Sequence, residues 1–449
     1  MWTRRGLILM LVLVYVLTVA SALAAEKFSV GQRVELRAFR EAGVPLYRDP
    51  HSYLLGRAPD DSSAVIHAMS ENQRWLNVEL EADGRVGWIV SRYVKRNLPF
   101  WPEGEMVIGP SSPTEAEWKV WTSAETCEQV VNAGQRMAPQ HPDVLRFATW
   151  NLRSFSKEGD EHSTGLDGDV QPTDLRWLAC VLTWMNVDLV VFQGLHATPA
   201  ARDAWEMITD GLHAYTGDIW LLSSQVCGGE ESQQIGFLRN ISRVSLTHMQ
   251  DLWQLNGRAE SKPSRFCPDS GRPGWYAFLK GVRREGVDLH LIGLHLEEGQ
   301  EPQAREWRQT ALTRLGEAVE PFLEQDDDVV VAGTFNIIAE DGGKTEPEKL
   351  ESVRRLVQEE QPGFTLVDMK PACTAYVDGK AMQLDHFLVA KGMAEAPQVE
   401  ARVTGICALH GCQNIETAPA AYRFLSAHCP VVYAIANHDQ DSAQAAVKP

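Results

Sequence analysis

The sequence is poor in positive charge: 42 lysine and arginine residues stand against 60 aspartate and glutamate residues, a formal net charge of -18. So acidic a surface repels nucleic acid unless a local basic groove compensates. Extensive nucleic-acid binding is therefore not expected, although a local phosphate site is compatible with this charge. After residue 25 the sequence also lacks any apolar run long enough to cross a membrane, which excludes a protein with several spans.

The first 25 residues have the pattern of an export signal. Arg4 and Arg5 precede the apolar run GLILMLVLVYVLTVA, and small residues follow near Ala24 and Ala25. We expect cleavage there and an exported protein, either in the bacterial periplasm or secreted. An uncleaved membrane anchor is the alternative, because the apolar run approaches spanning length. Removing residues 1–25 would change the net charge to -18 - 2 = -20.

The sequence has no C-x-x-C pair, yet eight cysteines follow the signal. An even number of cysteines in an exported chain favours disulfides. The sequence does not determine the pairing. Cys407 with Cys412 would close a short loop, and Cys227 with Cys267 would join two loops that flank a hairpin. A zinc site at Cys407 and His410 is the less favoured interpretation.

With 449 residues, 44% of them hydrophobic and 23% charged, the chain has the composition of a globular protein and room for two or three domains. Residues 27–98 contain short alternating segments such as RVELRAF, WLNVEL and VGWIVSRYV, separated by turn signals, which predicts a small all-β barrel. This segment resembles the bacterial Src-homology-3-like domains of exported proteins. The resemblance rests on a closing pattern formed by Trp75, Gly84, Gly87, Trp88 and Tyr93.

That resemblance implies a cell-wall component or a peptide as the ligand of the first domain. The plainer interpretation is that Trp75 and Trp88 belong to its core. A proline-rich linker begins the next segment, residues 99–143, and the stretch from 114 to 137 predicts one helix leading into the large domain.

Residues 144–437 alternate between strand and helix patterns, and residues 438–449 are expected to be a disordered tail. Strands as hydrophobic as LVVF and VVVA must be covered on both faces. Two packed sheets with helices outside would satisfy this requirement, and so would one large doubly wound sheet. Helices are expected at 173–185, 199–212 and 302–324, the first with Thr173 as its N-cap.

Six short motifs in this region resemble, in order and spacing, the endonuclease/exonuclease/phosphatase superfamily: FATWNLR, LVVFQG, IGLHLEEG, GTFN, LDHFL and SAHCPV. The resemblance spans nearly the whole large domain. It implies an α/β fold, a four-layer sandwich of two packed sheets flanked by helices, with the site at the strand ends. Members of this superfamily cleave phosphoesters with Mg²⁺ or Mn²⁺, which carboxylates hold.

Five polar residues match functional positions of the family. They are Asn151, His295, Asn336, Asp385, which orients the catalytic histidine, and His428, which is that histidine. Arg272 resembles a phosphate-contacting arginine of some members. Each has a structural interpretation as well: the asparagines can hold strand ends and turns, and the histidines and Asp385 can be satisfied core groups.

Three family carboxylates are replaced here. Gly194 stands where a glutamate holds the metal, Thr334 where an aspartate belongs, and Ala427 in place of the last aspartate. Glycine and alanine have no side-chain oxygen, and a neutral threonine is neither a good magnesium ligand nor a general base at neutral pH. Losing several members of one catalytic set should abolish the family mechanism.

We therefore predict a pseudoenzyme that keeps the phosphoesterase fold, uses no cofactor, and binds a phosphorylated or anionic ligand or a protein partner. The alternative is an active exported nuclease or phosphodiesterase with Mg²⁺ or Mn²⁺ at a relocated site. Glu297, Glu298, Asp341 and His196 could rebuild such a site with His295. A third interpretation makes the chain structural or adhesive, with the barrel as its working part.

Overall fold

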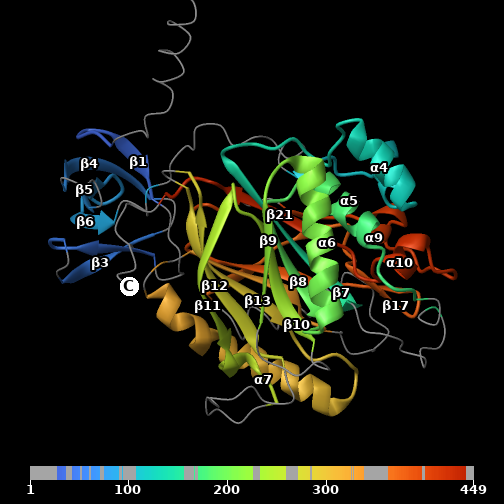
Figure 1. The fold of residues 1–449 in the computed structure, drawn as a ribbon. Coiled ribbons are helices and arrows are strands. Elements are labelled where there is room, and N and C mark those ends of the chain that lie inside the picture. Colours follow the sequence, from blue (N-terminus) through green and yellow to red (C-terminus); the bar gives the residue numbers. More distant parts are fainter. Residues whose placement is uncertain are drawn as a thin grey trace, which may run out of the picture. The chain divides into compact units, whose positions relative to one another are not determined.

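The structure is a computed structural model that forms two units, one before and one after residue 97. It describes residues 28–36, 43–50, 53–59, 62–70, 75–90, 94, 108–155, 166, 170–225, 233–258, 272–283, 286–324, 326, 328–337, 363–396 and 400–440. The expected α/β fold with an N-terminal all-β domain is confirmed (Figure 1).

Six short antiparallel strands build the first unit. They are β1 (Arg33–Glu35), β2 (Val44–Tyr47), β3 (Leu54–Ala58), β4 (Ser63–Met69), β5 (Trp75–Leu80) and β6 (Val86–Val90), in the sheet order β1-β4-β5-β6-β2-β3. Side chains that alternate along these strands, among them Ile66, Leu76 and Val78, form its core. This all-β architecture is the one that the alternating sequence predicts.

The two tryptophans of the first unit differ in burial. Trp75 is buried and packs edge-on against Tyr47, with ring centroids 5.5 Å apart, so its structural interpretation holds. Trp88 is half-buried on β6. Tyr93 lies outside the described residues.

Two sheets form the centre of the large unit. The first has the order β16-β20-β21-β7-β8-β10-β9 and the second the order β11-β12-β13-β14-β19-β15. The first comprises β7 (Val144–Phe155), β8 (Leu189–Leu195), β9 (Trp220–Ser224), β10 (Gln234–Asn240), β16 (Met369–Lys370), β20 (Ala401–Val403) and β21 (Val431–Ala436). The second comprises β11 (Val244–Leu252), β12 (Gly274–Gly281), β13 (Asp288–His295), β14 (Val329–Thr334), β15 (Phe364–Leu366) and β19 (Asp385–Ala390).

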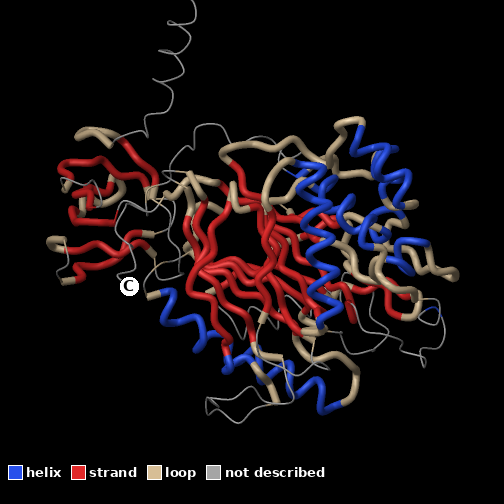
Figure 2. Tube along the Cα trace, viewed as in Figure 1, coloured by secondary structure: helices blue, strands red, loops and turns tan. Residues whose placement is uncertain are grey.

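Helices cover the outer faces of both sheets, which gives four layers (Figures 1 and 2). Those of the first sheet are α3 (Glu115–Val120), α4 (Ala124–Asn132), α5 (Leu175–Met185), α6 (Pro199–Thr216), α9 (Ile406–Leu409) and α10 (Ala420–Phe424). The helix of the second sheet is α7 (Pro302–Leu323), which packs beside the short η3 (Trp253–Leu255). A small hairpin of β17 (Ala375–Val377) and β18 (Lys380–Met382) completes the unit. Of the two arrangements that the sequence allowed, the structure therefore has two packed sheets with helices outside, not one doubly wound sheet.

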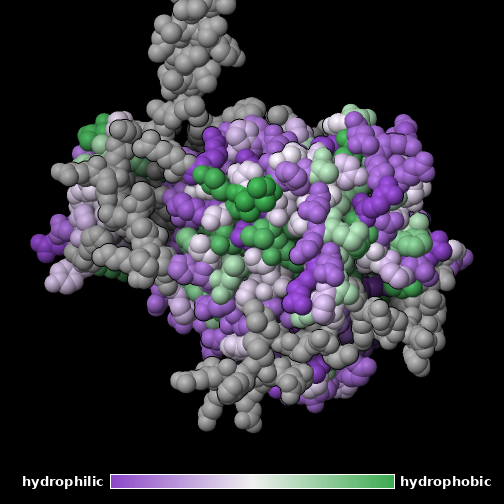
Figure 3. All heavy atoms as spheres, in the orientation of Figure 1, coloured by the Kyte–Doolittle hydropathy of each residue, from purple (hydrophilic) through white to green (hydrophobic). Residues whose placement is uncertain are grey.

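One hydrophobic core fills the space between the two sheets and also lies between the first sheet and helices α4, α5 and α6. A second core lies between the outer face of β12–β14 and α7. The outer side of α6 carries mostly hydrophilic residues (Figure 3), as an amphipathic helix with one buried stripe requires.

The segment before residue 144 holds two helices where the sequence predicts one. The first ends at Trp121, and Ser123 starts the next because its hydroxyl accepts a hydrogen bond from the Thr126 amide. Val120, Trp121 and Val131 lie in the main core of the large unit. Residues from 108 onward are thus part of this unit rather than a linker to it.

The start of α5 also differs from the prediction by one residue. Asp174, not Thr173, is the N-cap, and its carboxylate accepts from the Trp177 amide at 3.0 Å. An aspartate at this position satisfies a free amide and adds negative charge at the positive end of the helix.

Three disulfides lie in the described residues: Cys127–Cys180, Cys373–Cys412 and Cys407–Cys429. Cys407 and Cys412, one of the pairs that the sequence left open, are not joined to each other. Cys407 is fully buried in α9 and is bonded to Cys429, which precedes β21, whereas Cys412 follows α9 with a φ of 60° and is bonded to Cys373. The bond to Cys429 also rules out zinc at Cys407. Cys227 and Cys267 lie outside the described residues.

Disulfides of this kind are compatible with an extracellular or periplasmic protein. Within the described part of the chain, none of the helices combines the length and the apolar character that a membrane span requires. At the C-terminal end, Gln440 still contacts the large unit, since its amide donates to Glu395 at 2.5 Å, and residues 441–449 lie outside the described residues.

Candidate functional site

Strand register brings the candidate residues to one edge of the second sheet. His295 at the end of β13 pairs with Thr334 at the end of the parallel β14, and Thr334 pairs with Asp385 at the start of the antiparallel β19. Asn151 of β7 reaches across from the first sheet, and its amide donates to the Thr334 hydroxyl at 3.2 Å. The motifs that are distant in sequence therefore meet where the two sheets face each other.

Asp385 and His428 form a tight hydrogen-bonded pair at this edge. The Nδ1 of His428 lies 2.8 Å from one oxygen of Asp385, while the Thr334 hydroxyl donates to the other oxygen at 2.6 Å. Asp385 is fully buried, and the His428 side chain is 13% exposed. Because its Nδ1 faces the carboxylate, His428 presents Nε2 as the nitrogen available to a ligand.

Contacts from β7 and Ser426 hold the backbone of His428 in place. The Trp150 indole donates to the His428 carbonyl at 2.9 Å, and the His428 amide donates to the Ser426 hydroxyl at 3.0 Å. That hydroxyl in turn donates to the Asn151 carbonyl at 2.6 Å. The position of the histidine thus depends on β7 as well as on Asp385.

Asn151 is fully engaged inside the protein. Its Nδ2 lies 3.2 Å from the Thr334 hydroxyl and 3.4 Å from His295 Nε2, and its Oδ1 accepts from the Arg153 amide at 2.8 Å. Since these bonds use its amide and its oxygen, Asn151 joins the two sheets and is not placed to bind a ligand directly.

His295 is a neutral acceptor that holds Arg272. Burial, with smaller contributions from the charges of Arg272 and His428, keeps the pKa of His295 well below its ordinary value. Arg272 Nη1 lies 3.1 Å from His295 Nε2 and donates to the Leu296 carbonyl at 3.1 Å, and its Nη2 donates to the exposed Glu298. A neutral His295 thus fixes the guanidinium without adding charge.

Asn336 supports the turn after β14. Its backbone has a φ of 53°, a left-handed conformation that asparagine tolerates, and its side-chain amide donates to the Leu296 carbonyl at 2.8 Å. The same carbonyl accepts from Arg272, so the turn and the guanidinium share one anchor. Asn336 therefore has the structural role that its sequence also allowed.

The position of Gly194 is closed by the backbone. Gly194 has a φ of 76°, and a Cβ there would lie 1.7 Å from the carbonyl oxygen of Arg153 and 2.8 Å from Asn151 Oδ1. The register between β7 and β8 shifts beside it, between Asn151 and Phe155. A glutamate at 194 would therefore need a different backbone.

The other two replaced positions also offer no metal ligand. Thr334 is fully buried, and its hydroxyl is committed to Asp385. Ala427 is buried, and its carbonyl accepts from the Tyr376 amide at 3.0 Å. Among the described residues no group of three or more acidic, histidine or cysteine side chains is placed to hold a metal. The site does not fit the Mg²⁺ or Mn²⁺ of the family.

The residues proposed to rebuild a metal site form no metal-binding group in the described part of the chain. Glu297 is paired with Arg258, and Glu298 is paired with Arg272. His196 is buried after β8, and Asp341 lies outside the described residues. Two carboxylates that neutralise arginines are poorly disposed to bind a cation.

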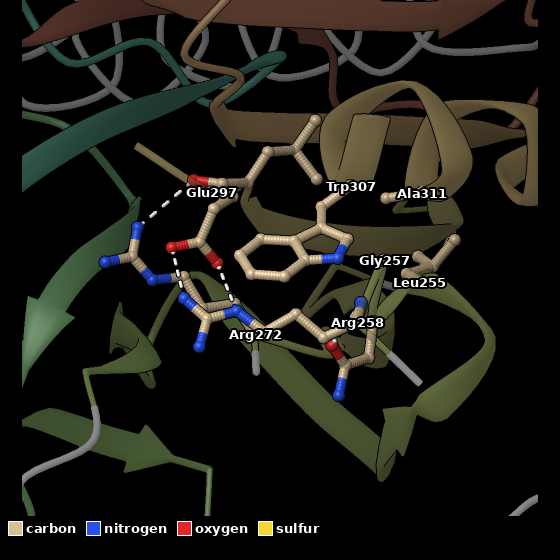
Figure 4. Close-up of a pocket in the computed structure, with 9 residues that line it drawn as sticks. Leu255, Gly257, Arg258, Arg272, Glu297, Trp307 and Ala311 are labelled. Atoms are coloured by element: carbon tan, nitrogen blue, oxygen red, sulfur yellow. Dashed lines mark hydrogen bonds and ion pairs between the residues drawn. The ribbon is translucent and has the colours of Figure 1, made fainter. Parts of the chain in front are cut away.

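A small pocket adjoins the site beside Arg272 (Figure 4). Its lining includes Leu255, Gly257, Glu297 and Trp307. The Arg258 guanidinium lies 4.5 Å from the centre of the Trp307 ring and forms two hydrogen bonds to Glu297, so it fills much of the space. The pocket therefore lies beside the site, and its charged lining residues are already in ion pairs.

Two contributors to the site were not among the predicted residues. Arg153 acts through its backbone carbonyl, which closes position 194, and Thr374 acts through its hydroxyl, which accepts from the Leu384 and Asp385 amides. Neither contact follows from a motif: the first joins the segments at residues 153 and 194, and the second joins a hydroxyl to backbone amides across the β17–β18 hairpin.

No protein-family model and no curated protein matches the chain. Solved structures do resemble it. The fold resembles that of endonuclease/exonuclease/phosphatase proteins. One such family protein, from Bacteroides thetaiotaomicron, has 13% identity and a TM-score of 0.44 over 66% of this chain and 98% of its own.

A mannosyl-6-phosphatase from the same organism has 14% identity and a TM-score of 0.42 over 64% of this chain and 98% of its own. The catalytic domain of human Nocturnin with bound sulfate has 12% identity and a TM-score of 0.41, over 66% and 95%. Likenesses this distant carry no information about ligand or reaction, which depend on the side chains of the site.

Proposed function

We propose that the large unit binds a phosphorylated or other anionic ligand at His428 and Arg272 without a divalent metal, and that it has lost metal-dependent hydrolysis. The observation that carries this proposal is the closed backbone at Gly194, where a side chain would lie 1.7 Å from the Arg153 carbonyl. A missing carboxylate alone could be restored by one substitution, but here the Arg153 carbonyl blocks the direction in which any side chain at 194 would leave the backbone.

The groups left for a ligand favour an anion. Asp385 orients His428 so that Nε2 faces away from the carboxylate and is the ring nitrogen open to a ligand. Arg272 uses Nη1 for two internal contacts and part of Nη2 for Glu298, which leaves further N–H donors. The side chains of His428 and Arg272 are 13% and 14% exposed, so both are partly desolvated donors that solvent can reach.

A compact phosphate monoester suits this site better than a nucleic acid. Only a few donors converge here, and the chain as a whole has a formal net charge of -18. Long-range repulsion from such a chain weakens binding to an extended polyanion more than to one small anion held by direct hydrogen bonds.

Calorimetry on the purified mature protein tests the proposal. Inorganic phosphate should bind, and Mg²⁺ and Mn²⁺ should not, and a generic phosphodiester should not be hydrolysed with either metal. We expect His428→Gln and Arg272→Gln each to weaken phosphate binding about tenfold or more, because each removes an imidazole or guanidinium nitrogen proposed to contact the anion.

Arg176→Gln is the matched control, since Arg176 is an exposed arginine paired with Glu128 on helices away from the site. Its phosphate affinity should equal that of the wild type. Magnesium-dependent turnover that disappears in His428→Gln would overturn the proposal and would favour the active-enzyme alternative.

For the first unit we propose a cell-wall component or a peptide as ligand, on the strength of its sequence resemblance alone. We also propose export, which the apolar leader and the three disulfides support. N-terminal sequencing of the protein recovered from its native host tests this, and a mature chain that still begins at Met1 would contradict cleavage.

A further inference from the structure

We infer that Thr374 is the positioning residue that holds Asp385 and His428 at hydrogen-bonding distance. Thr374 is fully buried and lies at none of the positions that carry the family motifs. Its segment contacts both the start of β19, which carries Asp385, and the loop before β21, which carries His428. The inference rests on the proposed function only for its effect on ligand binding, because the geometry stands without a ligand.

On the Asp385 side, the contact is made by the side chain. Thr374 Oγ1 accepts from the Leu384 amide and from the Asp385 amide, each at 2.9 Å. The Thr374 amide also donates to the Met382 carbonyl at 2.8 Å. One hydroxyl oxygen thus satisfies two consecutive buried amides at the point where β19 begins, and so fixes the direction in which Asp385 leaves the backbone.

On the His428 side, the contact is made by the backbone. The Thr374 carbonyl accepts from the Cys429 amide at 2.7 Å, and the next residue, Ala375, pairs with His428 in an antiparallel bridge. The Tyr376 amide donates to the Ala427 carbonyl at 3.0 Å. The residues on both sides of His428 are therefore paired with the segment that starts at Thr374.

Two disulfides keep this segment from sliding. Cys373, directly before Thr374, is joined to Cys412, and Cys429, directly after His428, is joined to Cys407. Cys407 and Cys412 belong to one short stretch around α9. The three segments are thus fixed to one another covalently, and the Thr374 hydroxyl is the contact that transmits their position to Asp385.

The Nδ1 proton of His428 gives a direct test. In protein labelled with ¹⁵N-histidine, this proton should give a downfield, slowly exchanging NMR signal because it is hydrogen-bonded to Asp385, and Asp385→Asn should abolish the signal. We expect Thr374→Val to move the signal upfield and broaden it, since valine keeps the shape but leaves both amides without their acceptor. Thr374→Ser keeps the oxygen and should restore it.

Thr183→Val is the matched control. Thr183 is also buried, and its hydroxyl donates to the Ala179 carbonyl within α5, away from the site. This variant should leave the His428 signal unchanged whatever it does to stability. An unaltered signal in folded Thr374→Val would overturn the inference.

If Thr374→Val does not fold, Thr374→Ser and Thr374→Ala decide the question. A folded alanine variant with the wild-type signal would refute the positioning role, and a lost signal that serine restores would support it. Phosphate binding separates the two proposals. We expect Thr374→Val to bind phosphate roughly tenfold more weakly as well as to change the His428 signal. If the wild type binds no phosphate but the variants change the His428 signal as described, only the proposed function is refuted.

Discussion

Gly194 and Thr334 replace family carboxylates under different physical constraints. Gly194 has a left-handed backbone against the Arg153 carbonyl, whereas Thr334 lies in a regular strand and donates to Asp385 at 2.6 Å. An aspartate at 334 would, when ionised, lack the hydroxyl proton that Thr334 donates to Asp385. A side chain at 194 thus meets a steric obstacle, whereas a change at 334 removes a buried hydrogen bond.

Replacing Gly194 by alanine should be strongly destabilising. The Cβ would lie 1.7 Å from a backbone oxygen, so the strands must separate locally, and we expect a loss of about 3 kcal/mol or more in the free energy of unfolding. Gly134→Ala is the control, because Gly134 has a φ of 77° with nothing within 4 Å, and it should cost about 1 kcal/mol. Equal losses in urea unfolding would show that the β7–β8 bulge yields easily.

His386 should make the protein sensitive to mild acid. Burial lowers the pKa of His386 to about 4, against smaller opposing effects of Asp385 and the Gln383 backbone. Its unfolded-state value is near 6.5, so both states are neutral above that pH. Between pH 6.5 and 4 the unfolded state binds the proton first and stability falls.

The variant His386→Phe keeps a ring beside Phe335, whose centroid lies 5.4 Å from that of His386, but it cannot titrate. The drop in unfolding free energy from pH 7 to pH 4 should be smaller than in the wild type by about 3 kcal/mol. His290, whose pKa burial also lowers to about 4, leaves part of the drop in place. An identical pH profile in the two proteins would contradict this assignment.

At the scale of the element, α3 is fixed to the first sheet by a buried ion pair. Glu117 contacts both Arg402 of β20 and the Thr404 hydroxyl, and all three side chains are buried. Burial raises the pKa of Glu117 despite the attraction of Arg402, so removal from water outweighs the pairing. The pair sets the place of α3 more than it stabilises the fold.

Removing one partner of this pair should therefore be costly. Arg402→Met leaves a buried carboxyl group without its cation, and we expect a loss of about 3–5 kcal/mol in unfolding free energy. The double variant Glu117→Leu with Arg402→Met should recover most of that loss. A single variant within 1 kcal/mol of the wild type would show that water reaches Glu117.

The elements were largely predictable because their local patterns agree with their burial. β8 and β14 are hydrophobic at nearly every position and are buried on both faces, as the runs LVVF and VVVA indicate. The break at Trp121 and the exact cap of α5 were not, because several residues there can cap a helix. The partner of Cys407 depends on which way α9 turns its side chains, which no spacing shows.

The same division applies to the site. Asp385 and His428 could be named from motifs because both act through side chains of fixed type. The closure at Gly194 and the contacts of Thr374 could not, since one is made by a backbone oxygen and the other joins a hydroxyl to backbone amides, which any residue type carries. Such contacts leave no residue pattern behind.

At the scale of the whole molecule, the large unit begins well before its first sheet strand. The chain separates between residues 97 and 98, and α3 and α4 contribute Val120, Trp121 and Val131 to the main core. The Cys127–Cys180 disulfide joins α4 to α5 across 53 residues, which is worth about 4 kcal/mol by chain entropy. The two helices are part of the fold.

A fragment of residues 108–440 should therefore fold alone, whereas one of residues 144–440 should not. The shorter fragment exposes the face of α5 and leaves Cys180 without its partner. Thermal unfolding followed by circular dichroism should show a cooperative transition only for the longer fragment. A cooperative transition of equal midpoint in both would place the boundary at residue 144 after all.

The bulge that blocks a side chain at position 194 also limits which substitutions the protein can accept by mutation. A glycine codon becomes a glutamate codon by one base change, so a lost metal ligand is ordinarily within easy mutational reach. Here that change would meet the Arg153 carbonyl before it met any metal. If position 194 once held the glutamate that the family resemblance assigns to it, a return would also require a different path of β7 between Asn151 and Phe155, where the register with β8 shifts.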